Sequence, residues 1–262
     1  MSTTLSPRIG TWLSVGSPVI AELAGMCGFD WVLIDLEHGC GTEAAVPDQL
    51  RALRGGPTEP IVRVGAPHPD LIARVLDWGA RGIMVPHVSS ADEAGAIVRA
   101  AHYAPRGRRG YSRTVRAHGY GLLQADDSPA PIIMAQIETI EGVNHAAEIA
   151  RVDGIDVLFI GPADLQFDLR HHAASAPLDF AKCRDIVLAA ARDSGKGAGI
   201  LVREAADLRP HLDMGFTRIA VDSDLSILRK SYAEILACIF PAHARNMGPR
   251  SIFGTGTAAG TL

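Results

Sequence analysis

The chain has 262 residues, of which 47% are hydrophobic, enough for one large domain with a sizeable core. Its formal net charge of -4 and its pI of about 6.2 give no indication of a nucleic-acid partner. No apolar run approaches the roughly 18 residues that a membrane span needs, and the amino terminus, MSTTLSPRIG, lacks the basic and apolar regions of a signal peptide. We therefore expect a cytoplasmic protein without a membrane or nucleic-acid partner.

Short apolar runs recur along the chain, and helical patterns lie between them. The predicted strands are Ile9–Val15, Trp31–Glu37, Pro60–Val64, Gly82–Val88, Ile132–Glu138, Asp156–Gly161, Gly197–Val202 and Thr217–Asp222. The predicted helices include Asp70–Trp78, Ala91–His102, Gly142–Arg151, Phe180–Asp193, Ala205–Met214 and Leu225–Phe240. Strands that are apolar on both faces are typical of a parallel sheet covered by helices. Eight of them in alternation with helices predict a single α/β domain, a (β/α)8 TIM barrel over residues 1–240.

A doubly wound open sheet is the main alternative to the barrel. It usually has fewer strands, and no GxGxxG motif follows the first strand. Two segments interrupt the alternation. Pro105–Pro129 is a long connection that contains the stretch RGRRGYSR, and we interpret it either as a loop that covers the barrel mouth or as a solvated loop. Residues 241–262 are rich in Gly, Ala and Thr, and we expect a flexible tail there rather than a partner-binding arm.

Polar side chains gather at the carboxyl ends of the predicted strands, where (β/α)8 barrels carry their chemistry. These side chains belong to Asp35, Glu37 and His38 on the second strand, Arg63 on the third, Gln136 and Glu138 on the fifth, and Asp164 in the stretch Gly161–Asp164 that ends the sixth. His38 and Arg63 are 25 residues apart, and Glu138 and Asp164 are 26 apart, about one strand–helix repeat in each case. We therefore expect the members of each pair to lie on neighbouring strands over the barrel mouth.

Glu138 and Asp164 are candidate ligands of a divalent cation. Two carboxylates on adjacent strands, without clustered Cys or His, favour a hard ion such as Mg2+ or Mn2+. The alternative is an Arg–carboxylate network without a metal, but Arg63 and His38 at matching strand ends favour the metal site. Backbone N–H groups in the turn Gly161–Asp164 could also bind a small carboxylate at the start of a helix. A plain strand-to-helix turn explains the Gly-Pro pair equally well.

Five stretches, DWVLIDLEHG, IVRVG, LDWGARGIMVPHV, QIET and GPADL, together resemble the HpcH/HpaI family of metal-dependent (class II) pyruvate aldolases. Its members include 4-hydroxy-2-oxoheptanedioate, 2-dehydro-3-deoxyglucarate and 2-keto-3-deoxy-rhamnonate aldolases. The resemblance runs from Ile9 to Phe240 with the motifs in order. It implies a barrel of the phosphoenolpyruvate/pyruvate-binding type that belongs to a homo-oligomer, a hexamer of domain-swapped dimers.

The reaction implied by the resemblance is that of an aldehyde-lyase. A 4-hydroxy-2-oxo acid is cleaved reversibly to pyruvate and an aldehyde, through a pyruvate enolate stabilised by a divalent metal ion (Mg2+ or Mn2+, with Co2+ as a further candidate). No organic cofactor is implied. The setting would be the catabolism of aromatic or sugar acids.

The resemblance also implies roles for individual residues. His38 matches the catalytic base, Arg63 the group that stabilises the enolate oxygen, and Asp77 the carboxylate that pairs with the base. The residues that match the metal ligands are Glu138 and Asp164, and those that match the substrate site are Gln136, Gly161, Pro162, Ala163 and Asp164.

Asp35 is a second candidate for orienting His38, because it lies only three residues away. Glu37 is predicted to be a structural partner, for example of an arginine. The chain departs from the family pattern at three positions, where the family often has Met or Gln, Pro, and Ser: His87, Cys40 and Gln166. We expect none of these three to touch the metal ligands, and we expect them to bear on aldehyde specificity.

The only lysines are Lys182, Lys196 and Lys230. Two fall in predicted helices and Lys196 precedes the seventh predicted strand, whereas a Schiff-base aldolase needs a lysine at the barrel mouth. The sequence therefore argues against an imine mechanism. The remaining alternatives are a lyase of the citrate-lyase β or malyl-CoA type, an oxaloacetate decarboxylase, and a catalytically silent barrel that acts as a binding subunit. No nucleotide-binding extension for CoA is evident, and the silent barrel would not need all the expected ligands.

Overall fold

Eight parallel strands close into a barrel in the computed structural model, which describes residues 6–123, 129–172 and 179–239. The strands are β1 (Arg8–Leu13), β2 (Trp31–Asp35), β3 (Glu59–Arg63), β4 (Gly82–Val85), β5 (Ile132–Ile137), β6 (Val157–Ile160), β7 (Gly197–Val202) and β8 (Arg218–Ser223). They pair in chain order, and β8 closes on β1. Each strand overlaps one predicted strand, so the predicted TIM barrel is confirmed.

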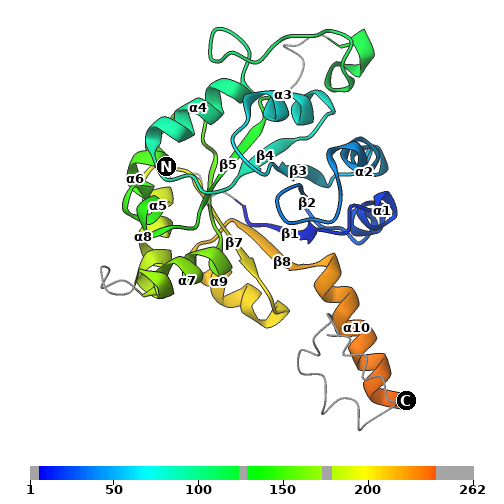
Figure 1. Ribbon diagram of the computed structural model, residues 1–262, viewed down its shortest axis with the longest axis vertical. Helices are drawn as coiled ribbons and strands as arrows, with labels where there is room; N and C mark the ends of the chain where they lie inside the picture. The colour runs from blue at the N-terminus through cyan, green and yellow to red at the C-terminus, as the bar shows by residue number, and fades with distance from the viewer. Residues whose placement is uncertain (1–5, 124–128, 173–178, 240–262) are drawn as a thin grey trace, which may run out of the picture. The chain divides into compact units, whose positions relative to one another are not determined.

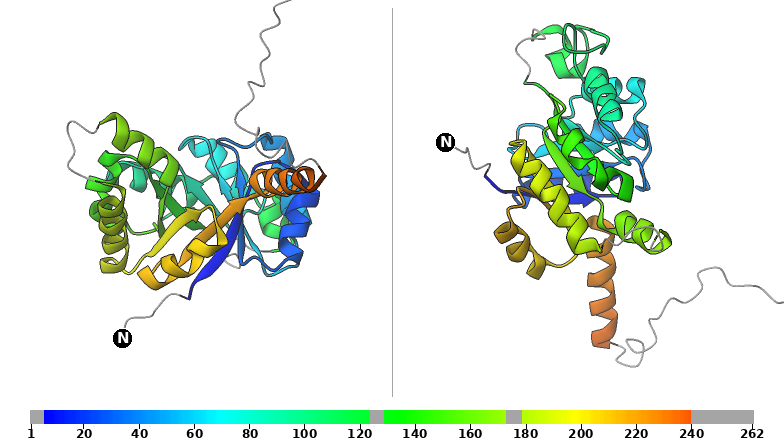
Figure 2. Two further views of the ribbon diagram at one scale, coloured as in Figure 1. Left: turned by 90° about the horizontal axis from the view of Figure 1, so that it is seen from below. Right: turned by 90° about the vertical axis from the view of Figure 1, so that its left-hand side faces the viewer.

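Helices surround the strands on the outside of the barrel, as Figures 1 and 2 show. They are α1 (Pro18–Met26), α2 (Val46–Ala52), α3 (Pro69–Asp77), α4 (Ala91–Ala101), α5 (Ile140–Asn144), α6 (Ala146–Arg151), α7 (Pro162–His171), α8 (Phe180–Asp193) and α9 (Leu208–Met214). The single helix predicted over Gly142–Arg151 is two helices, because His145 leaves the helical conformation at φ -100 and ψ 8. The helix predicted over Ala205–Met214 begins with a short 3-10 turn at Ala205–Asp207.

Alternate residues of each strand pack into two separate apolar cores. In β2, Val32 and Ile34 belong to the core between the barrel and its helices, whereas Trp31 and Leu33 belong to the core inside the barrel. Successive side chains of a strand point to opposite faces, so Asp35 is the next inward-facing residue after Leu33. The buried residues of the inner core are Trp12, Trp31, Leu33, Ile61, Met84, Ile132, Met134, Val157, Phe159 and Ala220. The barrel is therefore a packed interior, and chemistry is confined to its carboxyl end.

The chain divides into two compact units, Met1–Asp224 and Leu225–Leu262. The first unit contains the barrel. The described residues of the second belong to helix α10 (Asp224–Ile239), and the tail predicted over residues 241–262 lies outside the described residues. None of the described helices is long and apolar enough to cross a membrane.

Candidate active site

A layer of polar side chains ends the barrel interior at the carboxyl ends of the strands. Asp35, Arg63 and Gln136 are the inward-facing residues that follow the apolar ones in β2, β3 and β5, and Trp12 is their neighbour on β1. The side chains of Asp35 and Arg63 are only 2% and 7% exposed. Ionised groups are tolerated at such depth only when they are paired and hydrogen-bonded, so their partners decide what the site can do.

Asp35 and Arg63 are direct neighbours in the register of β2 and β3. Arg63 Nε and Nη2 donate to the two carboxylate oxygens of Asp35 at 2.9 and 2.8 Å. Trp12 Nε1 donates to the same carboxylate at 3.1 Å, and the Trp12 ring centroid lies 4.9 Å from the guanidinium carbon. Burial alone would raise the pKa of Asp35, but its hydrogen bonds and the charge of Arg63 outweigh burial and lower this pKa. The charged carboxylate holds the guanidinium plane in one orientation.

His38 lies beyond this pair, where the chain turns after the end of β2. The backbone N–H groups of Glu37 and His38 donate to Asp35 Oδ1 at 3.0 and 3.3 Å. The expectation that His38 would be the strand neighbour of Arg63 is therefore wrong, because β2 ends at Asp35 and Asp35 takes that place. The Asp35 carboxylate thus holds the backbone of His38. The imidazole is 65% exposed, with Nε2 3.8 Å from Glu37 Oε1.

Glu37 binds Arg63 from the other side. Its Oε2 lies 2.6 Å from Arg63 Nη1, which confirms the prediction that Glu37 partners an arginine. Its Oε1 faces two histidines, at 3.8 Å from His38 Nε2 and 3.5 Å from His87 Nε2. Arg63 is thus fixed between the carboxylates of Asp35 and Glu37.

Glu138 is a buried carboxylate at the end of β5, with a side chain only 1% exposed. Its Oε1 accepts the backbone N–H of His87 at 2.8 Å, and its Oε2 accepts Gln136 Nε2 at 2.5 Å. Burial raises the pKa of Glu138 to about 7; the hydrogen bond and charge of His87 oppose this rise, and the charges of Asp164 and Glu37 add to it. Within the described part of the chain, the buried Gln136 Oε1 has no hydrogen-bond partner. A cation beside Glu138 would favour its charged form.

Asp164 approaches the site from the first turn of α7 rather than from a strand. The register pairs Ile137 with Ile160, so the strand neighbour of Glu138 is Gly161. A Cβ atom on Gly161 would lie 2.2 Å from Glu138 Oε2, which leaves room only for glycine. Asp164 lies close enough for its charge to raise the pKa of Glu138.

The donor set at this end of the barrel fits a divalent cation. Arg63 pairs with both Asp35 and Glu37, so one positive charge faces two carboxylates there, and Glu138 and Asp164 add further negative charge without a cation of their own in these pairs. Oxygen donors of this kind suit Mg2+ and Mn2+. Donor atoms of Glu37, His87 and Glu138 also lie within 4.8 Å of one another.

Sequence reasoning missed two residues of the site, His87 and Trp12. The expectation that His87 would not touch the candidate metal ligands is wrong, since His87 Nδ1 lies 3.3 Å from Glu138 Oε1. The available signal was its position two residues after β4, the neighbour of the strand that carries Glu138. For Trp12 the signal was the alternation of side chains along β1, which points Trp12 into the barrel beside β2.

Asp77 lies at the opposite end of the barrel from His38. It is the last residue of α3, and in this fold the helices run back toward the amino ends of the strands. Asp77 Oδ1 pairs there with Arg109 Nη2 at 2.6 Å, and the Arg109 guanidinium carbon lies 4.6 Å from the Tyr103 ring centroid. The pairing expected between Asp77 and His38 is therefore not made within this chain.

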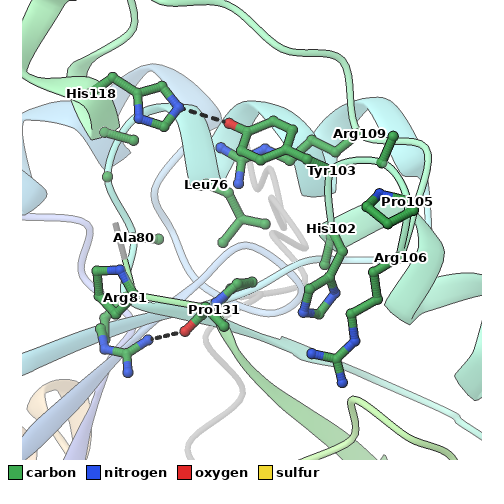
Figure 3. Close-up of a pocket in the computed structure, with 16 residues that line it drawn as sticks. Leu76, Ala80, Arg81, His102, Tyr103, Pro105, Arg106, Arg109, His118 and Pro131 are labelled. Atoms are coloured by element: carbon green, nitrogen blue, oxygen red, sulfur yellow. Dashed lines mark hydrogen bonds between the residues drawn. The ribbon is translucent and has the colours of Figure 1, made fainter. Parts of the chain in front are cut away.

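Arg109 and Tyr103 line a pocket of about 390 Å³ at that same end (Figure 3). In its wall the Tyr103 hydroxyl and His118 Nε2 are 3.0 Å apart. The long connection over Pro105–Pro129, of which residues 124–128 lie outside the described residues, joins the end of α4 to the start of β5. The interpretation of this connection as a loop over the mouth of its own barrel is therefore wrong, and the pocket is separate from the candidate active site.

Comparisons with known proteins agree with this geometry. The model of the HpcH/HpaI aldolase/citrate lyase family matches residues 8–231. A hydroxypyruvate/pyruvate aldolase of Paraburkholderia phytofirmans is 38% identical over 240 residues, 88% of this chain and 92% of that protein. A 5-keto-4-deoxy-D-glucarate aldolase of Salmonella paratyphi C is 36% identical over 231 residues, 87% of this chain and 90% of that protein. A crystal structure of an HpcH/HpaI aldolase/citrate lyase family protein from Burkholderia cenocepacia J2315 has a TM-score of 0.84 at 34% identity and covers 91% of this chain and 96% of that chain.

Proposed function

The chain belongs to the HpcH/HpaI aldolase/citrate lyase family and is an enzyme related to pyruvate aldolases, and on this premise we propose that it is a divalent-metal-dependent class II aldolase. In the proposed reaction, a 4-hydroxy-2-oxo acid is cleaved reversibly to pyruvate and an aldehyde. The observation that carries the proposal is the buried Arg63, fixed by Asp35 and Glu37, at the same end of the barrel as the buried carboxylate of Glu138.

Glu138 and Asp164 are the proposed ligands of the cation. When bound, the ion would supply positive charge to the keto oxygen and the carboxylate of a 2-oxo acid. Gln136 holds Glu138 through its amide N–H and keeps its own carbonyl oxygen available. We place the carboxylate of the substrate beside Gly161, Pro162 and Ala163, where α7 begins. The backbone N–H of Ala163 is the proposed donor, because Pro162 has none and that of Gly161 donates to the carbonyl oxygen of Ile137.

Arg63 stabilises negative charge on the enolate oxygen. An arginine side chain adds positive charge without competing for the proton that is transferred. The carboxylates of Asp35 and Glu37 fix its orientation before substrate arrives, and such preorganisation is what makes electrostatic stabilisation effective.

His38 moves the proton. In cleavage its imidazole accepts the proton of the C4 hydroxyl, the C3–C4 bond breaks, and the aldehyde leaves. The electron pair of that bond becomes the enolate of pyruvate, which is then protonated at C3. The exposed position of the imidazole suits this role, because the ring can face both solvent and a bound substrate.

Exchange of the pyruvate methyl protons tests the proposal directly. The protein is incubated with pyruvate in D2O, and loss of the methyl signal is followed by NMR with added Mg2+ or Mn2+ and with a chelator. We expect exchange that needs a metal and disappears in Glu138→Gln. Exchange that persists in the chelator would contradict a class II mechanism.

The second substrate is identified with a panel of aldehydes, offered with pyruvate and with hydroxypyruvate. Absence of both exchange and aldol product with every ion would favour the catalytically silent barrel. Homo-oligomerisation and a cytoplasmic location remain predictions, and light scattering of the purified chain tests the first.

A further inference from the structure

His87 lies between two carboxylates of the site. Its Nδ1 is 3.3 Å from Glu138 Oε1, and its Nε2 is 3.5 Å from Glu37 Oε1. These distances are too long for strong hydrogen bonds between charged groups, but the three side chains have donor atoms within 4.8 Å of one another. Hydrogen bonds between these three side chains therefore do not by themselves explain why the His87 ring lies between Glu37 and Glu138.

His87 also has an uncommon backbone conformation. Its φ is 55°, in the left-handed region that few residues other than glycine adopt. In this conformation the backbone N–H of His87 donates to Glu138 Oε1, the same oxygen that its ring approaches. An uncommon backbone conformation of this kind is most often retained where a site depends on it.

The spacing of the donor atoms matches that of two ligands of one ion. Ligand atoms at about 2.1 Å from an octahedral ion and at right angles to each other are about 3 Å apart. The 3.3 Å between His87 Nδ1 and Glu138 Oε1 is close to this value. On the other side of the ring, Glu37 is already bound to the Arg63 guanidinium, which would repel an ion placed there.

The far nitrogen of His87 faces the Glu37 carboxylate at 3.5 Å, on the side where a metal-bound histidine normally has a hydrogen-bond acceptor. Histidines that bind metals usually donate the N–H of their second ring nitrogen to a carboxylate, which fixes the tautomer and the ring orientation. Glu37 Oε1 faces His87 Nε2 in this position. Glu37, held in turn by Arg63, would thus orient the ring with Nδ1 toward Glu138.

We propose that His87 Nδ1 is a third protein ligand of the cation, beside Glu138 and Asp164, and that Glu37 orients it. This inference rests on the proposed metal-dependent function and makes its metal preference more specific. An imidazole ligand favours ions such as Co2+ over Mg2+, which prefers oxygen donors alone. The chain should therefore bind Co2+ and Mn2+ more tightly than a site of two carboxylates would, with little gain for Mg2+.

The experiment uses the full chain, stripped of metal and reloaded with Mn2+, Co2+ or Mg2+. Pulsed electron paramagnetic resonance of the Mn2+ form detects modulation from a directly bound nitrogen-14, and calorimetry gives the Kd for each ion. The variants are His87→Gln, Glu37→Gln and, as a matched control, His68→Gln, which changes an exposed histidine at the same end of the barrel.

We expect nitrogen modulation in the wild type, in His68→Gln and in Glu37→Gln, and none in His87→Gln. The Kd for Co2+ should rise about 10–100-fold in His87→Gln and by a smaller factor in Glu37→Gln, which loses only the orienting carboxylate. The Kd for Mg2+ should change least in His87→Gln.

Three results would overturn the inference. They are bound Mn2+ without nitrogen modulation in the wild type, modulation that persists in His87→Gln, and equal losses of affinity for all three ions in that variant. If the wild type shows no modulation but still exchanges the pyruvate methyl only with metal, the proposed function stands and the role of His87 falls. Exchange that is independent of metal contradicts the proposed function itself.

Discussion

The carboxylate of Asp35 and the guanidinium of Arg63 face each other across β2 and β3 and share two hydrogen bonds of 2.9 and 2.8 Å. The same carboxylate accepts the backbone N–H of His38 and the indole N–H of Trp12. One aspartate therefore sets the orientation of the proposed enolate-stabilising group and the start of the turn that carries the proposed base.

Asp35→Ala should destabilise the protein strongly. It removes one partner of a buried ion pair and leaves the Arg63 charge with less compensation, which costs about 3–5 kcal/mol. Urea unfolding measures the free energy of unfolding. Asp48→Ala is the control, because Asp48 pairs with Arg51 on the surface and its loss should change stability by about 1 kcal/mol or less. Equal effects of the two substitutions would show that the buried Asp35–Arg63 pair contributes no more to the free energy of unfolding than a surface pair.

Arg63→Lys should reduce exchange of the pyruvate methyl about 10²–10³-fold while the Kd for Mn2+ stays close to that of the wild type. Lysine keeps the charge but lacks the planar fork that reaches Asp35 and Glu37 together. NMR exchange rates and calorimetry measure the two effects. The control, Arg74→Lys, changes an exposed arginine of α3 and should leave both quantities unaltered.

His38→Ala should lower the rates of exchange and of aldol cleavage by about 10²–10⁴-fold. Because the His38 ring is 65% exposed, its removal should leave the melting temperature and the metal Kd nearly unchanged. His68→Ala provides the comparison for an exposed histidine outside the site. Loss of metal binding in His38→Ala would mean that the role of this residue has been misassigned.

The stability of the metal-free protein should fall as the pH rises toward neutrality. Burial raises the pKa of Glu138 from an ordinary 4.5 to about 7, so between these values the folded protein retains a proton that the unfolded chain has lost. The stabilisation is complete below about pH 4.5 and disappears as the pH passes about 7. Melting temperatures measured in a chelator from about pH 5 to pH 8 follow this loss.

Glu138→Gln isolates the contribution of this one carboxyl group, because glutamine resembles its protonated form. The difference in melting temperature between the wild type and this variant should become steadily less favourable to the wild type with rising pH. Excess Mn2+ should raise the melting temperature of the wild type at high pH and should have little effect on that of the variant. A difference that stays constant with pH would contradict the raised pKa.

Gly161→Ala should weaken metal binding by displacing the Glu138 carboxylate. Its Cβ would come within 2.2 Å of Glu138 Oε2 and 2.8 Å of Gln136 Nε2, so the carboxylate must move from its place. The Kd for Mn2+ should rise about tenfold or more, since orientation of metal ligands commonly controls affinity on this scale. Gly110→Ala, where a Cβ meets nothing within 4 Å, is the matched control and should bind Mn2+ as the wild type does.

Much of the architecture could be read from local patterns. The run WVLID is apolar on both faces until Asp35, and it forms β2 as predicted. Chain order then dictates that Arg63, Glu138 and the residues after β6 share one end of the barrel, because parallel strands all end on the same side. The five motifs by themselves also indicate the family. These features depend on short-range periodicity and on connectivity, which a sequence states directly.

The contacts within the site were decided only by the tertiary structure. Equal spacing suggested that His38 neighbours Arg63, but β2 ends at Asp35, and the turn that follows carries His38 beyond the register. His87 was passed over because its approach to Glu138 depends on a left-handed backbone conformation that no pattern of hydrophobicity reveals. Asp77 matched a motif, yet the direction of α3 places it at the other end of the same barrel. Sequence determines which residues reach each end of the barrel, whereas register, turns and helix direction in three dimensions determine which of them meet.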